Sequence, residues 1–241
     1  MAAYTTIDDP SAYFQVKTYT GNGGTNAITF DGNSDLSPDF VWLKMRSNAD
    51  NHTLFNTTSG VGERLFSNLG QVESTESTSL TAFGSDGFTL GADAIANANS
   101  ETFVSWNWKK SATSGFDIVT FTGNQTARTI SHSLSAKPEW LWIKNREKVE
   151  SWHTQHGALG ATKTAESNTT GAFGTGSTIW NDTEPTTSVF SVGNNGNINE
   201  TGSGIVVFLW ASKQGFSKFG SYSGNGNADG AFVYTGFKPA F

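Results

Sequence analysis

The sequence predicts an all-β protein made of two tandem β-sandwich domains, jelly-roll-like and of about 100 residues each, followed by a partial third repeat. Three observations predict it. The 241 residues include 27 Gly and 13% aromatics but only 15% charged residues, a composition typical of short strands and polar turns. Apolar and polar residues alternate with period two in several segments. One series of motifs also occurs twice and then begins again.

The alternation is clearest in residues 14–20 (FQVKTYT) and 140–145 (WLWIKN). Successive side chains of a strand point to opposite faces, so both segments are predicted strands. Apolar residues at helical spacing are rare. The best helical candidate, residues 93–99 (DAIANAN), is short and rich in Asn, which predicts a loop or a single turn.

The repeat starts at Phe14, Phe116 and Phe216, at intervals of 102 and 100 residues. Gly-Asn follows each start and predicts a tight hairpin turn with positive φ. PDFVWLKMR (38–46) then corresponds to PEWLWIKNR (138–146), and FVSWNWK (103–109) to VFLWASK (207–213). The predicted units are an N-terminal arm, two sandwich repeats and a partial third repeat, at residues 1–13, 14–113, 114–214 and 215–241.

The partial third repeat is long enough for only two strands. Two strands are unable to bury an apolar face by themselves, so they must pack on another surface. Three alternatives stay open. Residues 215–241 complete a sheet of the same chain, add a strand to the edge of another subunit, or begin a longer protein. The second predicts a homo-oligomer.

Charge and hydropathy exclude several classes of partner. The net charge of −6 argues against general binding to nucleic acid or anionic lipid. The longest apolar run, residues 205–211 (IVVFLWA), has the length of a strand and predicts no membrane insertion. The N-terminal residues show no secretion signal, and the absence of cysteine excludes disulfides.

Catalytic residues are not evident, and the sequence predicts a protein that is not an enzyme. His153 and His156 (WHTQH) have a spacing that suits metal binding on a helix, but the segment is not helical, so we interpret the histidines as loop residues. The carboxylates are scattered and no serine lies in a G-x-S-x-G turn. A glycan hydrolase is therefore only a remote alternative.

Calcium is the one cofactor for which ligands can be named. Residues 31–35 (DGNSD) and 225–230 (NGNADG) place side-chain oxygens at alternate positions, as calcium loops do. Neither stretch supplies the later bidentate glutamate, and polar turns explain both equally well. The sequence predicts no cofactor.

Aromatic residues carry most of the remaining information. Those at matching points of the two repeats are predicted core residues: Phe14, Trp42, Trp106, Phe116, Trp142 and Trp210. The neighbouring Lys44 and Lys144 are expected on the outer face. Trp152 and Trp180 lie in polar stretches and have no Trp counterpart in the first repeat, so they are candidates for a contact surface that binds a ligand.

The opening MAAYTTIDDPSAYFQ and the motifs FQVKTYTGNG, PDFVWLKMR, DGFTLG and FVSWNWK resemble a repeated β-rich domain of virion proteins from marine bacteriophages, including phages of cyanobacteria. The resemblance covers nearly the whole chain. The second unit departs from it, with GNQT in place of GNGG and FSVG in place of DGFTLG. It implies a structural, tail-fibre or head-decoration component on the virion surface that contacts other virion proteins, and it assigns no catalytic or ligand residues.

Two function classes follow. The first is a non-enzymatic virion structural protein that acts by oligomeric assembly and multivalent display. The second is a lectin-like, carbohydrate-binding module that recognises a host surface glycan. A decoration protein binds its particle and ignores sugars, whereas a receptor binder loses saturable sugar binding when an exposed tryptophan is replaced.

Overall fold

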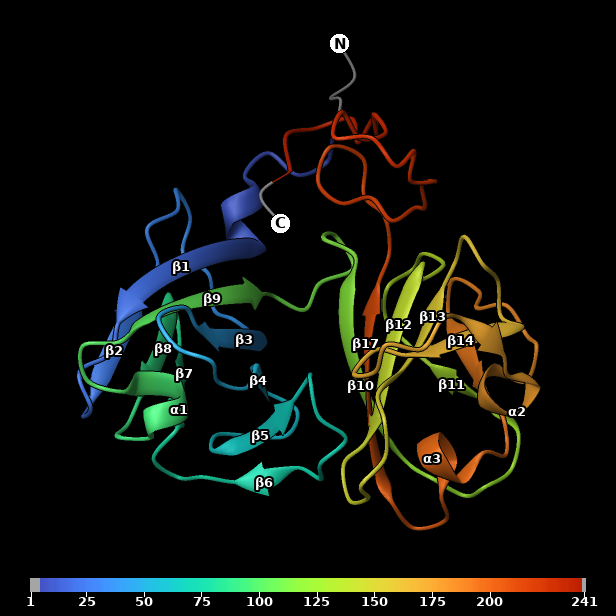
Figure 1. The fold of residues 1–241 in the computed structure, drawn as a ribbon, viewed down its shortest axis with the longest axis horizontal. Helices are drawn as coiled ribbons and strands as arrows, with labels where there is room; N and C mark the ends of the chain where they lie inside the picture. Colours follow the sequence, from blue (N-terminus) through green and yellow to red (C-terminus); the bar gives the residue numbers. More distant parts are fainter. Residues whose placement is uncertain (1–4, 240–241) are drawn as a thin grey trace.

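The computed structural model describes residues 5–239 and is all-β, with antiparallel sheets (Figure 1). The first large sheet is built from the N-terminal half of the chain. Its six strands stand in the order β1 (Phe14–Thr20), β9 (Thr102–Trp108), β3 (Phe40–Met45), β4 (Thr53–Asn56), β5 (Glu63–Phe66) and β6 (Ser74–Thr75).

The second large sheet repeats this order with the corresponding strands of the C-terminal half. They are β10 (Phe116–Thr122), β17 (Gly204–Trp210), β12 (Trp140–Asn145), β13 (His153–His156), β14 (Lys163–Glu166) and β15 (Gly174–Thr175). Even the register is the same, since Phe14 pairs with Trp108 and Phe116 pairs with Trp210. The two halves therefore share their strand pairing. The register places Trp108, and not Trp106, at the position of Trp210, so the sequence correspondence of residues 103–109 with 207–213 is wrong by two residues.

A small sheet lies behind each large one. The strands of these two sheets are β2 (Asn26–Thr29), β8 (Gly87–Leu90) and β7 (Leu80–Gly84) in the first half, and β11 (Arg128–Ser131) and β16 (Val189–Val192) in the second. Helices are single turns, namely η1 (Pro10–Ala12), α1 (Ala94–Asn97), α2 (Ser177–Trp180) and α3 (Gly196–Asn199). The predicted single turn within residues 93–99 is confirmed by α1.

Apolar residues form three clusters. Two fill the space between a large sheet and its small sheet, around Val41 and Phe88 in the first half and around Leu141 and Phe190 in the second. The third, which we call the central aromatic cluster, lies between the two large sheets. Its buried members are Phe40, Leu54, Leu65, Trp108, Phe116, Ile118, Trp142, Trp152, Val206, Phe208 and Trp210.

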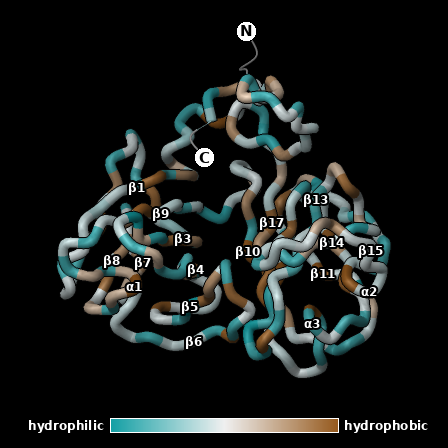
Figure 2. Tube along the Cα trace, in the orientation of Figure 1, coloured by the Kyte–Doolittle hydropathy of each residue, from teal (hydrophilic) through white to brown (hydrophobic). Residues whose placement is uncertain are grey.

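The apolar run at residues 205–211 is explained by its place in this arrangement. Ile205, Val207 and Leu209 point into the sandwich core of the second half, whereas Val206 and Phe208 point into the central aromatic cluster. A strand covered on both faces loses the usual alternation of apolar and polar residues. Figure 2 shows hydrophobic stretches along β10 and β17 in the interior of the molecule.

The glycines of the first two Gly-Asn pairs, Gly21 and Gly123, have a different role from the predicted one. Neither Gly21 nor Gly123 has positive φ. A Cβ at either position would lie 2.1 Å from a backbone oxygen, that of Ala98 or of Glu200. These glycines therefore allow close approach of two backbones.

A buried asparagine holds this junction in both halves. Asn97 accepts from the Asn22 amide (3.0 Å) and donates to the carbonyls of Gly24 and Gly91 (both 2.7 Å). Asn199 makes the corresponding contacts with the Asn124 amide and the carbonyls of Thr126 and Gly193. Both side chains are fully buried, and their hydrogen bonds satisfy the backbone where strand pairing stops.

The expected exposure of Lys144 is wrong. Its side chain is fully buried, and Nζ donates to the carbonyls of Asn145 (2.6 Å) and Lys148 (2.9 Å). Lys44 donates to the carbonyls of Met45 and Asn48 in the same way. The lysines that end residues 42–44 (WLK) and 142–144 (WIK) thus hydrogen-bond to the turn that follows each strand.

The C-terminal segment, residues 215–239, forms no strand and lies at one end of the large sheets beside the N-terminal residues (Figure 1). An isolated bridge between Lys213 and Ser217 is its link to regular pairing. Strands β1 and β10 pair with the closing strand of their own half, and no such strand follows Phe216 within the described residues. The alternative in which this segment completes a sheet of the same chain is therefore wrong for residues 215–239.

Two predicted units extend beyond the described residues. Residues 1–4 of the N-terminal arm and residues 240–241 of the partial third repeat lie outside them. Within the arm, Ile7 is buried. Among residues 5–239, no helix has the length and apolar character needed to cross a bilayer.

Candidate functional site

The predicted core residues all belong to the central aromatic cluster. Phe116, Trp142 and Trp210 are buried, which confirms their prediction, while Phe14, Trp42 and Trp106 are half-buried against the same cluster. They lie between the two halves of the chain, and their partners across the interface come from the other half. The repeated aromatic residues thus join the halves.

The contacts across the cluster are close. The ring of Phe40 lies 4.5 Å from that of Phe208 and 5.9 Å from that of Phe116. Trp42 meets Trp142 at 5.5 Å, and Trp108 meets Trp210 at 6.2 Å. Offset and edge-on aromatic pairs of this kind add stabilisation beyond the area they bury.

The prediction of a contact surface at Trp152 and Trp180 is wrong, because both side chains are fully buried. Trp152 packs on Trp142 at 4.3 Å and donates from Nε1 to the Phe66 carbonyl of the other half (2.9 Å). Trp180 fills the sandwich core of the second half. The polar neighbours of both residues along the chain gave no sign of this burial.

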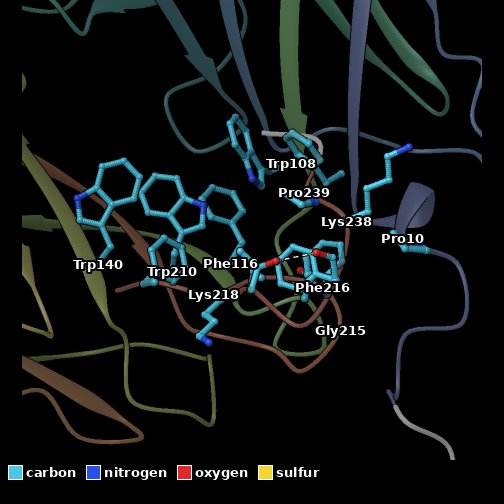
Figure 3. A pocket seen from close by; sticks show the side chains of 16 residues that line it. Pro10, Trp108, Phe116, Trp140, Trp210, Gly215, Phe216, Lys218, Lys238 and Pro239 are labelled. Atoms are coloured by element: carbon cyan, nitrogen blue, oxygen red, sulfur yellow. Dashed lines mark hydrogen bonds between the residues drawn. The ribbon is translucent and has the colours of Figure 1, made fainter. Parts of the chain in front are cut away.

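A cavity of about 430 Å³ opens where the central aromatic cluster meets the C-terminal segment. We call it the socket. Its rings come from both sources (Figure 3), and they are Phe14, Trp108, Phe116, Trp140 and Trp210 from the sheets and Phe216, Phe219 and Phe237 from the C-terminal segment. Sequence reasoning missed Trp108 and Trp140 as cavity residues, although their strand parity matches that of Trp106 and Trp142.

Polar groups in the socket are already engaged. The hydroxyls of Ser114, Ser217 and Thr235 donate to the backbone carbonyls of Ser111, Ala211 and Phe237, respectively. Lys218 and Lys238 line the rim with their carbon chains and direct their ammonium groups away from the rings (Figure 3). The interior is accordingly apolar and aromatic.

The C-terminal segment also carries four exposed large apolar side chains, among them Phe232, which is more exposed than any other large apolar residue in the described part of the chain. Phe232 is 90% exposed, Tyr222 71%, Tyr234 69% and Val233 52%. Single exposed apolar residues are ordinary, but a run of them is typical of a contact surface.

Ser133, His132 and Asp117 line one surface hollow but do not form a catalytic triad. Ser133 donates to Asp117 (2.8 Å), which also pairs with Lys110 (2.9 Å). Burial raises the pKa of Asp117, but hydrogen bonds from Lys110 and Ser133 outweigh it and lower the pKa. The ring nitrogens of His132 face the Leu134 amide and the Thr186 carbonyl, and neither faces Ser133.

The WHTQH histidines are in strand β13, so their interpretation as loop residues is wrong. His153 is buried, and neither ring nitrogen has a hydrogen-bond partner among residues 5–239. Burial lowers the pKa of His153, the nearby Glu166 carboxylate raises it by a smaller amount, and the charge of Lys144 lowers it further. The ring therefore packs as a neutral group inside the second half.

The two calcium-like stretches do not gather carboxylates. Asp31 pairs with Lys17 (2.9 Å), and Asp229 accepts at its backbone carbonyl from Asn225 (3.3 Å). Within residues 5–239, no group of three histidine, aspartate or glutamate side chains is placed to hold a metal ion.

A family model described as a domain of unknown function, DUF7483, matches residues 9–241, and the chain therefore belongs to this family. The match includes the C-terminal segment together with both halves. No curated protein matches the sequence.

Proposed function

We propose that this chain is a non-enzymatic structural protein displayed on the surface of a bacteriophage particle, as a head decoration or as part of a fibre or tail fibre. It acts by assembly with its own copies and with other virion proteins, and through this assembly it supports attachment to the host. The resemblance of the repeat motifs to virion proteins supports the setting, and the geometry of the C-terminal segment supports the mode of action.

The finer organisation belongs to this proposal. The repeated strand order supports two tandem sandwich domains, at residues 14–113 and 114–214, with residues 215–241 as the start of a third. Four neighbouring strands, β3 to β6, follow one another as a meander, so each domain departs from the jelly-roll order expected from the sequence. The central aromatic cluster joins the two domains into one unit.

The main support for the proposal is the exposure of the C-terminal segment, which corresponds to the start of a third repeat. Its counterparts in the first two repeats, β1 and β10, are paired strands, whereas residues 216–234 carry exposed aromatic side chains and form no strand. Apolar side chains at this exposure are stabilised when another surface covers them. The family match extends through this segment, which supports a role for it in the domain.

The structure gives less support to the lectin-like alternative than the sequence did. The two tryptophans proposed to bind sugar, Trp152 and Trp180, are buried. The socket offers aromatic rings, but its three hydroxyls already donate to backbone carbonyls. Sugar sites need free polar groups beside their aromatic platforms.

Two measurements test the proposal. Sedimentation equilibrium of the full chain should give a defined oligomer whose mass is a multiple of 25.8 kDa. Mass spectrometry of phage particles purified from the host that carries the gene should find its peptides at stoichiometric levels. A chain that stays monomeric at every concentration, or particles without these peptides, would contradict the proposal.

A further inference from the structure

The socket has the character of a site for an apolar side chain. Rings of Trp108, Trp140 and Trp210 form its walls, and its hydroxyls have no donor left for a polar guest. Its volume of about 430 Å³ falls within the range of pockets that hold a bound molecule, roughly 300–1,000 Å³. Water in such a space finds few hydrogen-bond partners, so an apolar guest displaces it favourably.

The chain itself exposes a guest of matching chemistry. Residues 232–234 (Phe-Val-Tyr), which we call the plug, project from the C-terminal segment with Phe232 90% exposed. Because Phe232 is exposed, it does not fill the socket of its own chain. Thr235 and Phe237, directly after the plug, line the socket, so plug and socket are adjacent but separate surfaces.

Charge complementarity supports pairing between copies. The rim of the socket carries Lys218 and Lys238, and no carboxylate lines it. Asp229, three residues before the plug, is the one charged residue between positions 219 and 237. Lys218 donates from Nζ to the Tyr234 carbonyl of its own chain (2.8 Å) and lies over the Tyr234 ring. No ion pair involves Asp229 or Lys238 among the described residues. An aspartate arriving with the plug would therefore meet the Lys238 cation at the rim.

We propose that the plug of one copy inserts into the socket of a second copy, with Asp229 of the incoming chain beside Lys238. This inference rests on the proposed function and specifies its interface. Plug and socket are different surfaces of one chain, so two copies that exchange plugs form a closed two-fold dimer, whereas one-way insertion forms a ring or a fibre. Phe232 is the central anchor, and Lys238 sets orientation and association rate.

Two single variants separate the surfaces. Phe232→Ser removes the anchor at an exposed position, and Phe219→Asp places a carboxylate in the socket wall on a residue outside the sheets. Each should raise the dissociation constant of the assembly by about 30-fold or more, so that each protein alone sediments as a monomer. The control Val149→Ser changes an apolar residue that is 75% exposed and far along the sequence, and it should assemble like the wild type.

Mixing the two variants gives the decisive result. Phe219→Asp retains its plug and Phe232→Ser retains its socket, so an equimolar mixture should form a heterodimer with one intact junction. A loss of assembly caused by misfolding would not be rescued in this way. If the wild type assembles but the variants assemble equally well, or if the mixture stays monomeric, the plug-and-socket interface is wrong while the proposed function stands.

A monomeric wild type would overturn the proposed function and the interface together. Binding of 8-anilinonaphthalene-1-sulfonate by that monomer, lost in Phe219→Asp, would then assign the socket to a small apolar ligand. That outcome also counts against a second copy as the occupant.

Discussion

Trp42 and Trp142, which occupy the same position in the two repeats, pack directly against each other with ring centroids 5.5 Å apart. Trp108 and Trp210, a second equivalent pair, also meet across the interface, at 6.2 Å. Equivalent positions touch each other when two copies face one another about an axis of approximate two-fold symmetry. The two halves of this chain therefore associate like the subunits of a symmetric dimer.

Coupling between Trp42 and Trp142 is the first prediction. Trp142→Ala should lower the free energy of unfolding by about 3–5 kcal/mol, because the indole is buried among other rings. A double-mutant cycle with Trp42→Ala in chemical denaturation should give an interaction energy of at least about 0.5 kcal/mol. Val149→Ala, at an exposed site, should change stability by less than about 0.5 kcal/mol. Strict additivity of the two tryptophan changes would contradict direct packing.

The buried asparagines provide the second prediction. Asn97→Ala and Asn199→Ala should each lower the free energy of unfolding by about 2–4 kcal/mol, since each leaves several backbone groups without partners. Asn48, which is exposed, serves as the matched control, and Asn48→Ala should have an effect below about 0.5 kcal/mol. Equal losses of stability for the buried and the exposed asparagines in thermal unfolding would contradict the role given to the hydrogen bonds of Asn97 and Asn199.

The ion pair between the halves yields the third prediction. Arg146 donates from Nε to Glu73 (2.7 Å), whose side chain is only 8% exposed, and the Glu73 amide donates to the Arg146 carbonyl (2.7 Å). Glu73→Gln should lower the free energy of unfolding by about 1–3 kcal/mol, because the partly buried guanidinium of Arg146 loses its counter-charge. Asp31→Asn breaks the exposed pair with Lys17 and should have little effect. Urea denaturation measures the free energy of unfolding of both variants. An equal loss in the two variants would contradict the prediction that burial makes the Arg146–Glu73 pair more important.

The pH dependence of stability follows from Lys144. Burial lowers its pKa from the ordinary 10.5 to about 8, against a smaller opposing effect of Glu150. Below pH 8 the lysine is protonated in both the folded and the unfolded chain. Between pH 8 and 10.5 the unfolded chain binds more protons, so the penalty of burying the charge declines and stability rises with pH.

This fourth prediction is tested by comparison with Lys144→Met. Relative to that variant, the free energy of unfolding of the wild type should rise by about 1–2 kcal/mol between about pH 7.5 and 9.5. The range ends below the titration of tyrosines near pH 10, because burial raises the pKa of Tyr19 and that shift acts in the opposite direction. Parallel stability curves for the two proteins would mean that Lys144 does not titrate in this range.

Period-two alternation and the repeated motifs were enough to predict the all-β class and the strands at residues 14–20 and 140–145, because strand parity is a local property. They were insufficient to predict what covers each face. The aromatic residues of both repeats share a parity, but only the folded chain shows that their partners lie in the other half. Trp152 was misjudged for this reason, since its acceptor, the Phe66 carbonyl, is 86 residues away in the sequence.

The socket was beyond sequence reasoning for a related cause. Its walls come from the ends of strands in both halves and from the C-terminal segment, and they include residues as far apart in the sequence as Phe14 and Phe237. The Gly-Asn pairs show a second limit. A glycine is required both where φ is positive and where another backbone segment approaches closely. The sequence alone does not distinguish these two requirements.

The most direct test of the assembly claim compares the mass of the wild type in solution with that of a variant in which Phe232, Val233 and Tyr234 are all replaced by serine. Replacement of these exposed residues is preferable to deletion of residues 215–241, because the deletion also removes Phe219. Phe219 packs on the central aromatic cluster, and its loss would uncover Trp140. Our account predicts a defined oligomer for the wild type and a folded monomer for the variant in sedimentation equilibrium. The same mass for both proteins would contradict it.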